Sequence, residues 1–252
     1  MSENSQHEDV VTQSSSRAAG EIVERHRHTD DQLIYVSRGV IAVATDAGGW
    51  VASSNRAVWI PAETWHQHRF HGSSRFHTVG FAAVERVLDA DGPAVISVTP
   101  LVRELVIAAA EDVRGADELS RIRAVLRDQL RRVPQEPVSL PAPRDDRLAR
   151  ACDLVLADLS VPRPLGDLAA AAGAGERTLA RLFHDEMGMT YPQWRTNIRV
   201  YQAMIALAEG RSITATAHDC GWATPSAFIS AFRQVTGRTP RAYQIETVPV
   251  RS

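Results

Sequence analysis

Six of the nine histidines in this 252-residue chain fall between positions 26 and 77. Imidazole binds divalent metals and donates hydrogen bonds, so such a cluster can hold a metal ion or an organic ligand. His26 and His28 are two positions apart, and on a β-strand both rings point to one face. His66, on a later segment of β character, can complete a group of three. The spacing therefore predicts a histidine site in the N-terminal part of the chain.

The histidines are positioned by short apolar or alternating segments, which run from about residue 21 to residue 83 with predicted turns between them at 46–49, 53–55 and 71–74. The predicted strands are 32–37, 40–45, 50–54, 57–60 and 75–81. Such regular short strands are typical of a sandwich or barrel, so we expect an all-β domain. By alternation His68 shares a face with His66, whereas His71 and His77 are predicted to lie at the surface.

Helix is expected after Pro100. The apolar residues of 118–133 recur every three or four positions, which places them on one stripe of a helix. The stripe consists of Leu119, Ile122, Leu126, Leu130 and Val133. Either it packs on the β-domain of its own chain, or it forms the seam of a homodimer. Four prolines within 134–143 then interrupt the periodicity and predict a semi-rigid linker.

Beyond the linker the chain is expected to be entirely helical, and one design occurs twice. The predicted helices are 146–159, 165–172, 176–186, 191–207, 213–220, 226–236 and 240–244. Gly173 and Gly221 follow the first helix of each pair, where a left-handed backbone suits glycine. Thr224 is expected to cap the last helix of the second pair, with Pro225 at its first turn. Helix, glycine-containing turn and helix indicate two helix-turn-helix units.

The second half also resembles the AraC/XylS-type transcription regulators. The matching positions are Ala217, Gly221, Trp222, Thr224, Phe228, Phe232, Gly237, Pro240 and Tyr243, with Leu168, Gly173, Arg177, Phe183 and Gly188 upstream. The resemblance covers about a hundred residues, with Gln244 where the family often has Arg and Gly175 where it usually has Ser. It implies two helix-turn-helix subdomains joined by the long helix 191–207, with recognition helices about one DNA turn, ~34 Å, apart.

The resemblance also implies which residues face DNA. These are Arg177, Thr178, Ala180 and Arg181 in the first unit, and Thr224, Pro225, Ser226, Ala227, Ser230 and Arg233 in the second. Arginine can form two hydrogen bonds to a guanine edge, so the first helix-turn-helix is expected to carry more of the sequence specificity. The small residues of the second unit suit methyl, phosphate or shape contacts.

The histidine segments resemble the two motifs of cupin barrels, through Gly20, His26, His28, Gln32 and Gly39 and through Asn55, Pro61 and His66. Gln32 stands where a glutamate is usual, and the second motif lacks its usual glycines and asparagine. The resemblance implies a site formed by His26, His28, Gln32 and His66. Three interpretations remain open: a divalent metal such as Zn, Ni, Mn or Fe(II), a pocket for an organic effector, or an inherited structural feature.

These observations predict a mixed fold with an all-β cupin-like barrel, flanking helices and an all-α C-terminal domain. The expected parts are a disordered tail 1–20, the barrel 21–97, a helical packing or dimerisation segment 98–133, the linker 134–144, the DNA-binding domain 145–245 and a tail 246–252. The chain lacks lysine, and residues 145–252 hold 12 arginines against 11 acidic residues, so bulk charge hardly marks a DNA-binding domain.

The function expected is a sequence-specific DNA-binding transcription regulator rather than an enzyme. Its partners would be double-stranded DNA, a second copy of the chain, a small-molecule or metal effector and RNA polymerase. No apolar run approaches the roughly 18 residues of a membrane span, and two isolated cysteines suit a reducing cytoplasm. The alternative is a cupin-type metal-dependent enzyme, a dioxygenase or isomerase, using the same histidines and Gln32.

Overall fold

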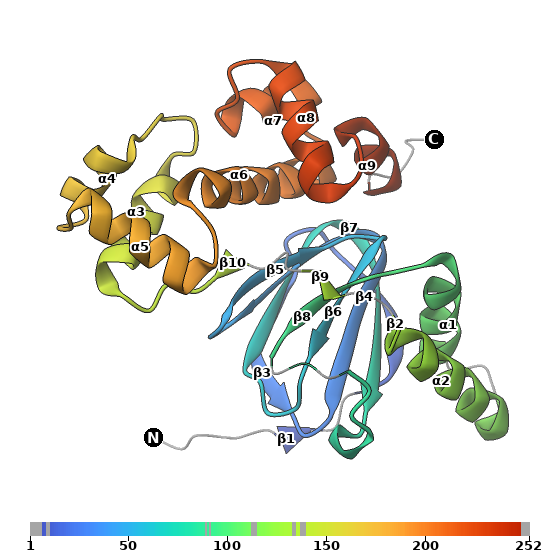
Figure 1. Cartoon of the computed structure of the whole chain (residues 1–252). Helices are drawn as coiled ribbons and strands as arrows, with labels where there is room; N and C mark the ends of the chain where they lie inside the picture. Colours follow the sequence, from blue (N-terminus) through green and yellow to red (C-terminus); the bar gives the residue numbers. More distant parts are fainter. Residues whose placement is uncertain are drawn as a thin grey trace. The chain divides into compact units, whose positions relative to one another are not determined.

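The computed structural model of the chain describes residues 7–8, 11–88, 90, 92–111, 115–132, 135–136 and 140–247. It forms two compact units, Met1–Ser139 and Leu140–Ser252. The first unit is a β-sheet with helices beside it, and the second is built almost entirely of helices (Figure 1). This confirms the predicted fold class. The tail beyond Thr247 lies outside the described residues.

The first unit is dominated by one curled sheet. Its strands are β1 (His7–Glu8), β2 (Gln13–Arg17), β3 (Ile22–His28), β4 (Asp31–Thr45), β5 (Gly48–Ala52), β6 (Arg56–Ile60), β7 (His66–Phe81), β8 (Ala94–Ser97) and β9 (Gln135–Glu136). The main order is β1-β3-β7-β4-β6-β8-β9, with β2 added to β7 and β5 added to β4. All these pairings are antiparallel except that of β1 with β3. A short 3-10 helix, η1 (Ala83–Glu85), follows β7.

Two long strands replace elements that were predicted to be shorter. β4 unites the predicted strands 32–37 and 40–45, and its pairing with β7 shifts register on both sides of Arg38. Gly39 has φ +82, and a Cβ there would lie 2.2 Å from Ser74 Oγ, so the bulge needs glycine. The predicted turn at 71–74 is wrong because these residues belong to β7. The predicted disordered tail 1–20 is also wrong in part, since β2 pairs with β7.

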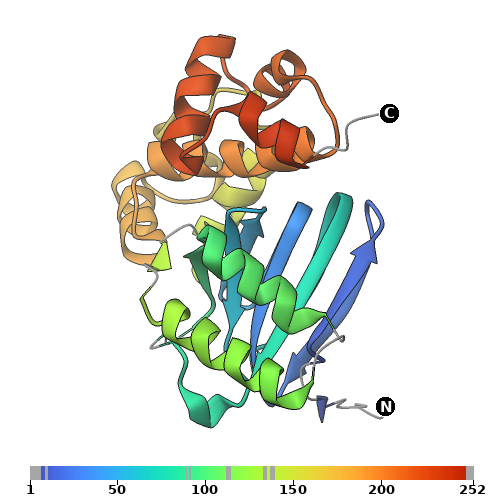
Figure 2. The same cartoon turned by 90° about the vertical axis from the view of Figure 1, so that its right-hand side faces the viewer.

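Alternation along β4 produces two apolar cores. Ile34 and Val36 pack with Trp50 and Phe70 on one face of the sheet, inside its curl. Leu33 and Tyr35 point the other way, into a cluster shared with the helices α1 (Pro100–Ala110) and α2 (Ala116–Leu130). Figure 2 shows this helix pair lying against the sheet. Both faces of β4 are therefore buried.

The apolar stripe of α2 is used within the protomer. Leu126 and Leu130 are fully buried in the cluster with α1 and the sheet, and Leu119 and Ile122 pack against the same cluster. Val133 lies outside the described residues. Of the two interpretations of the stripe, packing on its own β-domain is the one observed, so Leu126 reports on folding rather than on dimerisation.

Leu126→Ala should therefore lower the free energy of unfolding of the first unit by about 2–5 kcal/mol, because it removes a fully buried side chain and leaves a cavity. Val125→Ala, at the neighbouring exposed position, should change it by less than about 0.5 kcal/mol. Urea unfolding followed by circular dichroism would measure both. An equal, small effect of the two substitutions would contradict the packing described.

The second unit is a bundle arranged around one long helix. After the short β10 (Leu140–Pro141) come α3 (Asp146–Ala157), α4 (Leu165–Ala171), α5 (Glu176–Met187), α6 (Tyr191–Ala208), α7 (Ile213–Asp219), α8 (Pro225–Thr236) and α9 (Pro240–Thr247). The start of α6 packs through Trp194 and Ile198 in a core with α3, α4 and α5. Further along, α6 contacts α7, α8 and α9. It thus joins two small subdomains (Figure 1).

Within the part of the chain that the structure describes, no helix has the length and apolar character needed to cross a bilayer.

Candidate nucleic-acid interface and histidine cluster

The turns of the two helix pairs, α4–α5 and α7–α8, have the same hydrogen bonds. In the first, Ala174 N donates to Ala169 O at 2.8 Å, and in the second Trp222 N donates to Ala217 O at 2.9 Å. Each bond closes the end of the first helix around a left-handed glycine, Gly173 with φ +75 and Gly221 with φ +79. The predicted pair of helix-turn-helix units is therefore present in the geometry.

The outer face of α5 presents a row of exposed side chains. Arg177, Ala180 and Arg181 are exposed and Thr178 is half-buried, whereas Leu179, Leu182 and Phe183 lie in the core. Gly175 is the N-cap but offers no side chain to the first turn. The helix thus holds two long cations on the surface opposite its core contacts, as a recognition helix requires.

The outer face of α8 is smoother. Thr224 Oγ1 accepts a hydrogen bond from Ala227 N at 3.2 Å, and Pro225 occupies the first turn, as predicted. Ser226, Ala227, Ser230 and Arg233 are exposed on this face, with Thr224 and Pro225 at its start. Phe228 and Phe232 are fully buried on the other face, in an aromatic series with Trp222 and Tyr243. The predicted residues thus lie together on one surface.

Two sets of arginines in the second unit differ in their contacts. Arg150, Arg195 and Arg199 donate to backbone carbonyls of their own domain, those of Ala172, Leu159 and Val161, and so have a structural role. Within the described part of the chain, Arg177 and Arg181 form no hydrogen bond or ion pair with another residue. Their five N–H donors each remain available to phosphates or base edges.

Three exposed residues on the same faces were not predicted. His184 lies one turn after Arg181 on α5, and Ile229 and Gln234 lie on α8 beside Ser230 and Arg233. Ile229 is 38% exposed and helps to line a shallow groove of about 600 Å³ along α8. The three- and four-residue spacing from Arg181 and Ser226 would have identified them.

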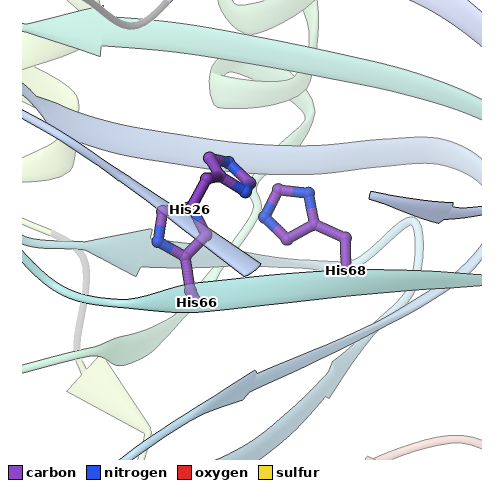
Figure 3. A group of neighbouring side chains, drawn as sticks. All are labelled: His26, His66 and His68. Atoms are coloured by element: carbon purple, nitrogen blue, oxygen red, sulfur yellow. The ribbon is translucent and has the colours of Figure 1, made fainter. Parts of the chain in front are cut away.

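In the first unit, three histidines gather between β3 and β7 (Figure 3). His26 on β3 is paired with His66 on β7, and His68 follows two positions later on the same face of β7. Each ring offers one nitrogen as a possible metal ligand, and these three nitrogens lie within 4.8 Å of one another. His28 stands close by, with its ring centroid 4.7 Å from that of His26.

Backbone carbonyls fix two of the three rings. The Nδ1 atoms of His26 and His66 lie 2.7 Å from Glu24 O and Thr64 O, and a carbonyl can only accept. Both Nδ1 atoms therefore carry a proton, so in the neutral form of either ring the lone pair lies on Nε2. Burial lowers the pKa of His66 to about 4, against a smaller opposing effect of the Thr64 carbonyl. Burial likewise holds the pKa of His68 well below its usual value.

The predicted set His26, His28, Gln32 and His66 is thus brought together only in part. Gln32 is buried and its Nε2 donates to Thr78 Oγ1 at 3.1 Å, whereas its Oε1 has no hydrogen-bond partner among the described residues. The third member of the group is His68, which belongs to neither of the two cupin-like motifs. A pocket of about 380 Å³ opens onto His26, His28, Gln32 and His68. This volume is in the range of small-ligand sites.

The prediction that His71 and His77 lie at the surface is wrong. His71 is 8% exposed and His77 only 1%, because strand β7 continues through the segment that the sequence suggested to be a turn. His77 Nε2 lies 2.8 Å from Ser37 Oγ, and its ring stacks on Tyr35. Burial, with smaller contributions from Arg75 and Arg103, lowers the pKa of His77 to about 4.

His77 should therefore make the first unit sensitive to acid. Because the folded-state pKa lies below the unfolded value near 6.5, the unfolded chain binds the proton more tightly, and stability falls as the pH drops from about 6.5 to about 4. We expect a loss on the order of 1–3 kcal/mol from this residue. Urea unfolding at several pH values should show a shallower decline for His77→Gln than for the unmodified chain. Parallel curves would contradict this role.

Comparison with known proteins gives two domain matches. A helix-turn-helix domain family model matches residues 168–245, and a cupin domain family model matches residues 16–80. The first covers both helix pairs, and the second covers the strands that hold the histidines.

Several characterised proteins are similar to this chain. The HTH-type transcriptional regulator NimR of Escherichia coli is 27% identical over 221 residues, which are 86% of this chain and 81% of NimR. The HTH-type transcriptional regulator RipA of Corynebacterium glutamicum is 35% identical over 112 residues, 44% of this chain and 33% of RipA. The crystal structure of the AdpA DNA-binding domain in complex with a target DNA is 32% identical, with a TM-score of 0.38; it covers 40% of this chain and 92% of that domain.

Proposed function

We propose that this chain, a DNA-binding transcriptional regulator in which an AraC-type helix-turn-helix domain follows a cupin domain, binds promoter DNA under the control of an effector in its β-domain. The observation that carries the DNA-binding function is the repeated helix-turn-helix with its exposed face on α5 and α8. The similarity to NimR and RipA favours the regulator over the cupin-type enzyme.

We assign DNA contact to two sets of side chains. Arg177 and Arg181 are the candidates for base contacts, since they are exposed and form no hydrogen bond or ion pair with other described residues. The remaining members of the surface are Thr178, Ala180, Thr224, Pro225, Ser226, Ala227, Ser230 and Arg233. The cation of Arg233 suits a phosphate, and the small residues allow α8 to approach the DNA backbone closely.

The effector is assigned to the 380 Å³ pocket beside the histidines. A pocket of this size with several convergent polar groups is suited to a small molecule or to a metal ion with its ligands. We further propose that the chain acts in the cytoplasm as a homodimer and contacts RNA polymerase at the promoter. Residues 134–144 would connect the sensing domain to the DNA-binding domain. A dimer places more recognition helices on the duplex and so raises specificity.

Selection of genomic fragments by the full chain, followed by footprinting, would test the proposal. We expect protection of two patches about one helical turn, ~34 Å, apart on one face of the duplex. Affinity should fall steeply with salt, with a slope of log K against log salt of about −0.9 for each phosphate contacted. Uniform binding to all fragments, or binding that does not change with salt, would contradict a sequence-specific regulator.

A further inference from the structure

We propose that His26, His66 and His68 form an all-nitrogen site for one divalent transition-metal ion of the Zn²⁺ class. This inference deepens the effector site of the proposed function, but metal binding itself does not depend on DNA binding. The ligand set differs from the one that the sequence motifs imply, because His68 takes the place of both His28 and Gln32.

The first argument is the number of buried nitrogens that no described group satisfies. His66 is 1% exposed and His68 is 2% exposed, yet His66 Nε2 and both ring nitrogens of His68 have no hydrogen-bond partner among the described residues. An unsatisfied buried polar atom costs about 1–3 kcal/mol, so three such atoms side by side need a compensating partner. A cation bound to the lone pairs of His66 Nε2 and of one His68 nitrogen satisfies two of the three.

The second argument is the orientation of the rings. The carbonyls of Glu24 and Thr64 hold the Nδ1–H groups of His26 and His66, as carbonyls do behind metal-binding histidines, and direct both Nε2 atoms inward. The three ligand atoms lie within 4.8 Å of one another. Tetrahedral Zn–N bonds of about 2.0–2.1 Å would place them roughly 3.3 Å apart, which side-chain rotation can achieve.

The third argument is the local charge. Three arginines line the pocket, which at first sight suits an anion better than a cation. Each of them is already paired with a carboxylate: Arg17 with Glu21 at 2.6 Å, Arg25 with Asp46 at 2.9 Å and Arg27 with Glu63 at 3.4 Å. Their charge is thus largely compensated, and they are less available to an organic anion. This favours the metal over a carboxylate ligand.

The chemistry of the donors limits the choice of ion. Three neutral imidazoles suit Zn²⁺, Ni²⁺, Co²⁺ and Cu²⁺, whereas Mg²⁺, Ca²⁺ and Mn²⁺ prefer the oxygen ligands that this group lacks. His66 does not line the pocket, but His26 and His68 do, so the ion would be reached from the pocket side. A further coordination position would then face the pocket, open to water or a small ligand.

Zinc titration of the tag-free full chain by calorimetry would test this site. We expect one Zn²⁺ per chain, no heat with Mg²⁺, and a rise in the melting temperature with zinc. His68→Asn should weaken zinc binding by at least about 100-fold, since even supporting residues around a metal contribute 10- to 100-fold. His28→Asn, the neighbouring ring, and His77→Asn, a buried histidine of the same strand, should leave the affinity within a few-fold of the original.

An absence of zinc binding would overturn the inference, and so would retention of affinity by His68→Asn. Loss of affinity in His28→Asn with retention in His68→Asn would restore the ligand set implied by the sequence motifs. Should His68→Asn fail to fold, NMR of the ring nitrogens in the unmodified chain decides, because zinc must shift the Nε2 signals of His26 and His66 together with one nitrogen of His68. DNA binding is measured separately, by footprinting without metal, so an absence of zinc binding would not contradict the proposed DNA binding.

Discussion

Replacing Arg177 and Arg181 together with alanine is expected to abolish sequence-specific DNA binding without unfolding the second unit. Both side chains are exposed on α5 and form no hydrogen bond or ion pair with other described residues, so we expect the fold to tolerate their removal. Each bidentate contact of an arginine with guanine contributes about 1–3 kcal/mol to discrimination, so the pair should cost at least about 2 kcal/mol, or roughly 30-fold in affinity. Gel shifts with a selected fragment would measure it.

The control must remove the same charge elsewhere. Arg121 and Arg131 are exposed arginines of α2 and its C-cap in the first unit, and their double alanine variant changes the net charge equally. We expect it to bind the selected fragment almost normally. If both double variants lose affinity to the same extent, the arginines act only through net charge. If neither does, α5 does not read the bases.

Arg233→Ala provides a graded comparison with the α5 pair. Because a phosphate contact carries no sequence information, this variant should weaken binding to all fragments alike and reduce the salt slope by about 1. Loss of Arg177 and Arg181 should instead reduce the difference in affinity between selected and unselected fragments. The two kinds of contact can thus be separated in one set of titrations.

Most of the second unit could be predicted because its determinants are local. Gly173 and Gly221 mark helix ends, Thr224 and Pro225 mark a helix start, and the apolar spacing separates Phe228 and Phe232 from the exposed face. Each of these signals involves residues fewer than six positions apart, which the sequence displays directly. The predicted helices accordingly differ from α3–α8 by only one or two residues at their ends.

The histidine group was harder to predict because it depends on strand pairing over long separations. His26 meets His66 across forty residues, and the register that aligns them contains an irregularity between Val23 and His26. Alternation showed that His68 shares a face with His66, but only this register brings that face against β3. The bulge at Gly39 likewise depends on its approach to Ser74, a contact that local sequence does not reveal.

Gly221→Ala is expected to be among the most damaging single substitutions in the second unit. Gly221 has φ +79, where a side chain costs about 1–2 kcal/mol. Its Cβ would also lie 2.4 Å from Leu159 O and 2.8 Å from Ser160 Cα, which are backbone atoms that cannot rotate away. Such overpacking costs typically 1–3 kcal/mol, so we expect a total of about 2–5 kcal/mol in urea unfolding.

The matched controls are Gly188→Ala and Gly237→Ala. Both glycines have positive φ, +65 and +74, but a Cβ on either meets nothing within 4 Å. They should therefore show the backbone cost alone, about 1–2 kcal/mol. The difference between them and Gly221→Ala measures the close approach to Leu159 and Ser160 specifically.

Because of the position of Gly221, the substitution by alanine should also weaken DNA binding. Leu159 O accepts a hydrogen bond from Arg199 Nη2 at 3.1 Å, and the Arg199 guanidinium lies 5.5 Å from the centre of the Trp222 ring. This junction connects the segment before α4 to the turn between α7 and α8, and so connects one helix-turn-helix to the other. Gly221→Ala should weaken binding to a DNA site that spans both helix-turn-helix subdomains more than binding to one half of that site. Equal losses on both DNAs, or stability like that of the controls, would show that the junction does not fix the spacing of α5 and α8.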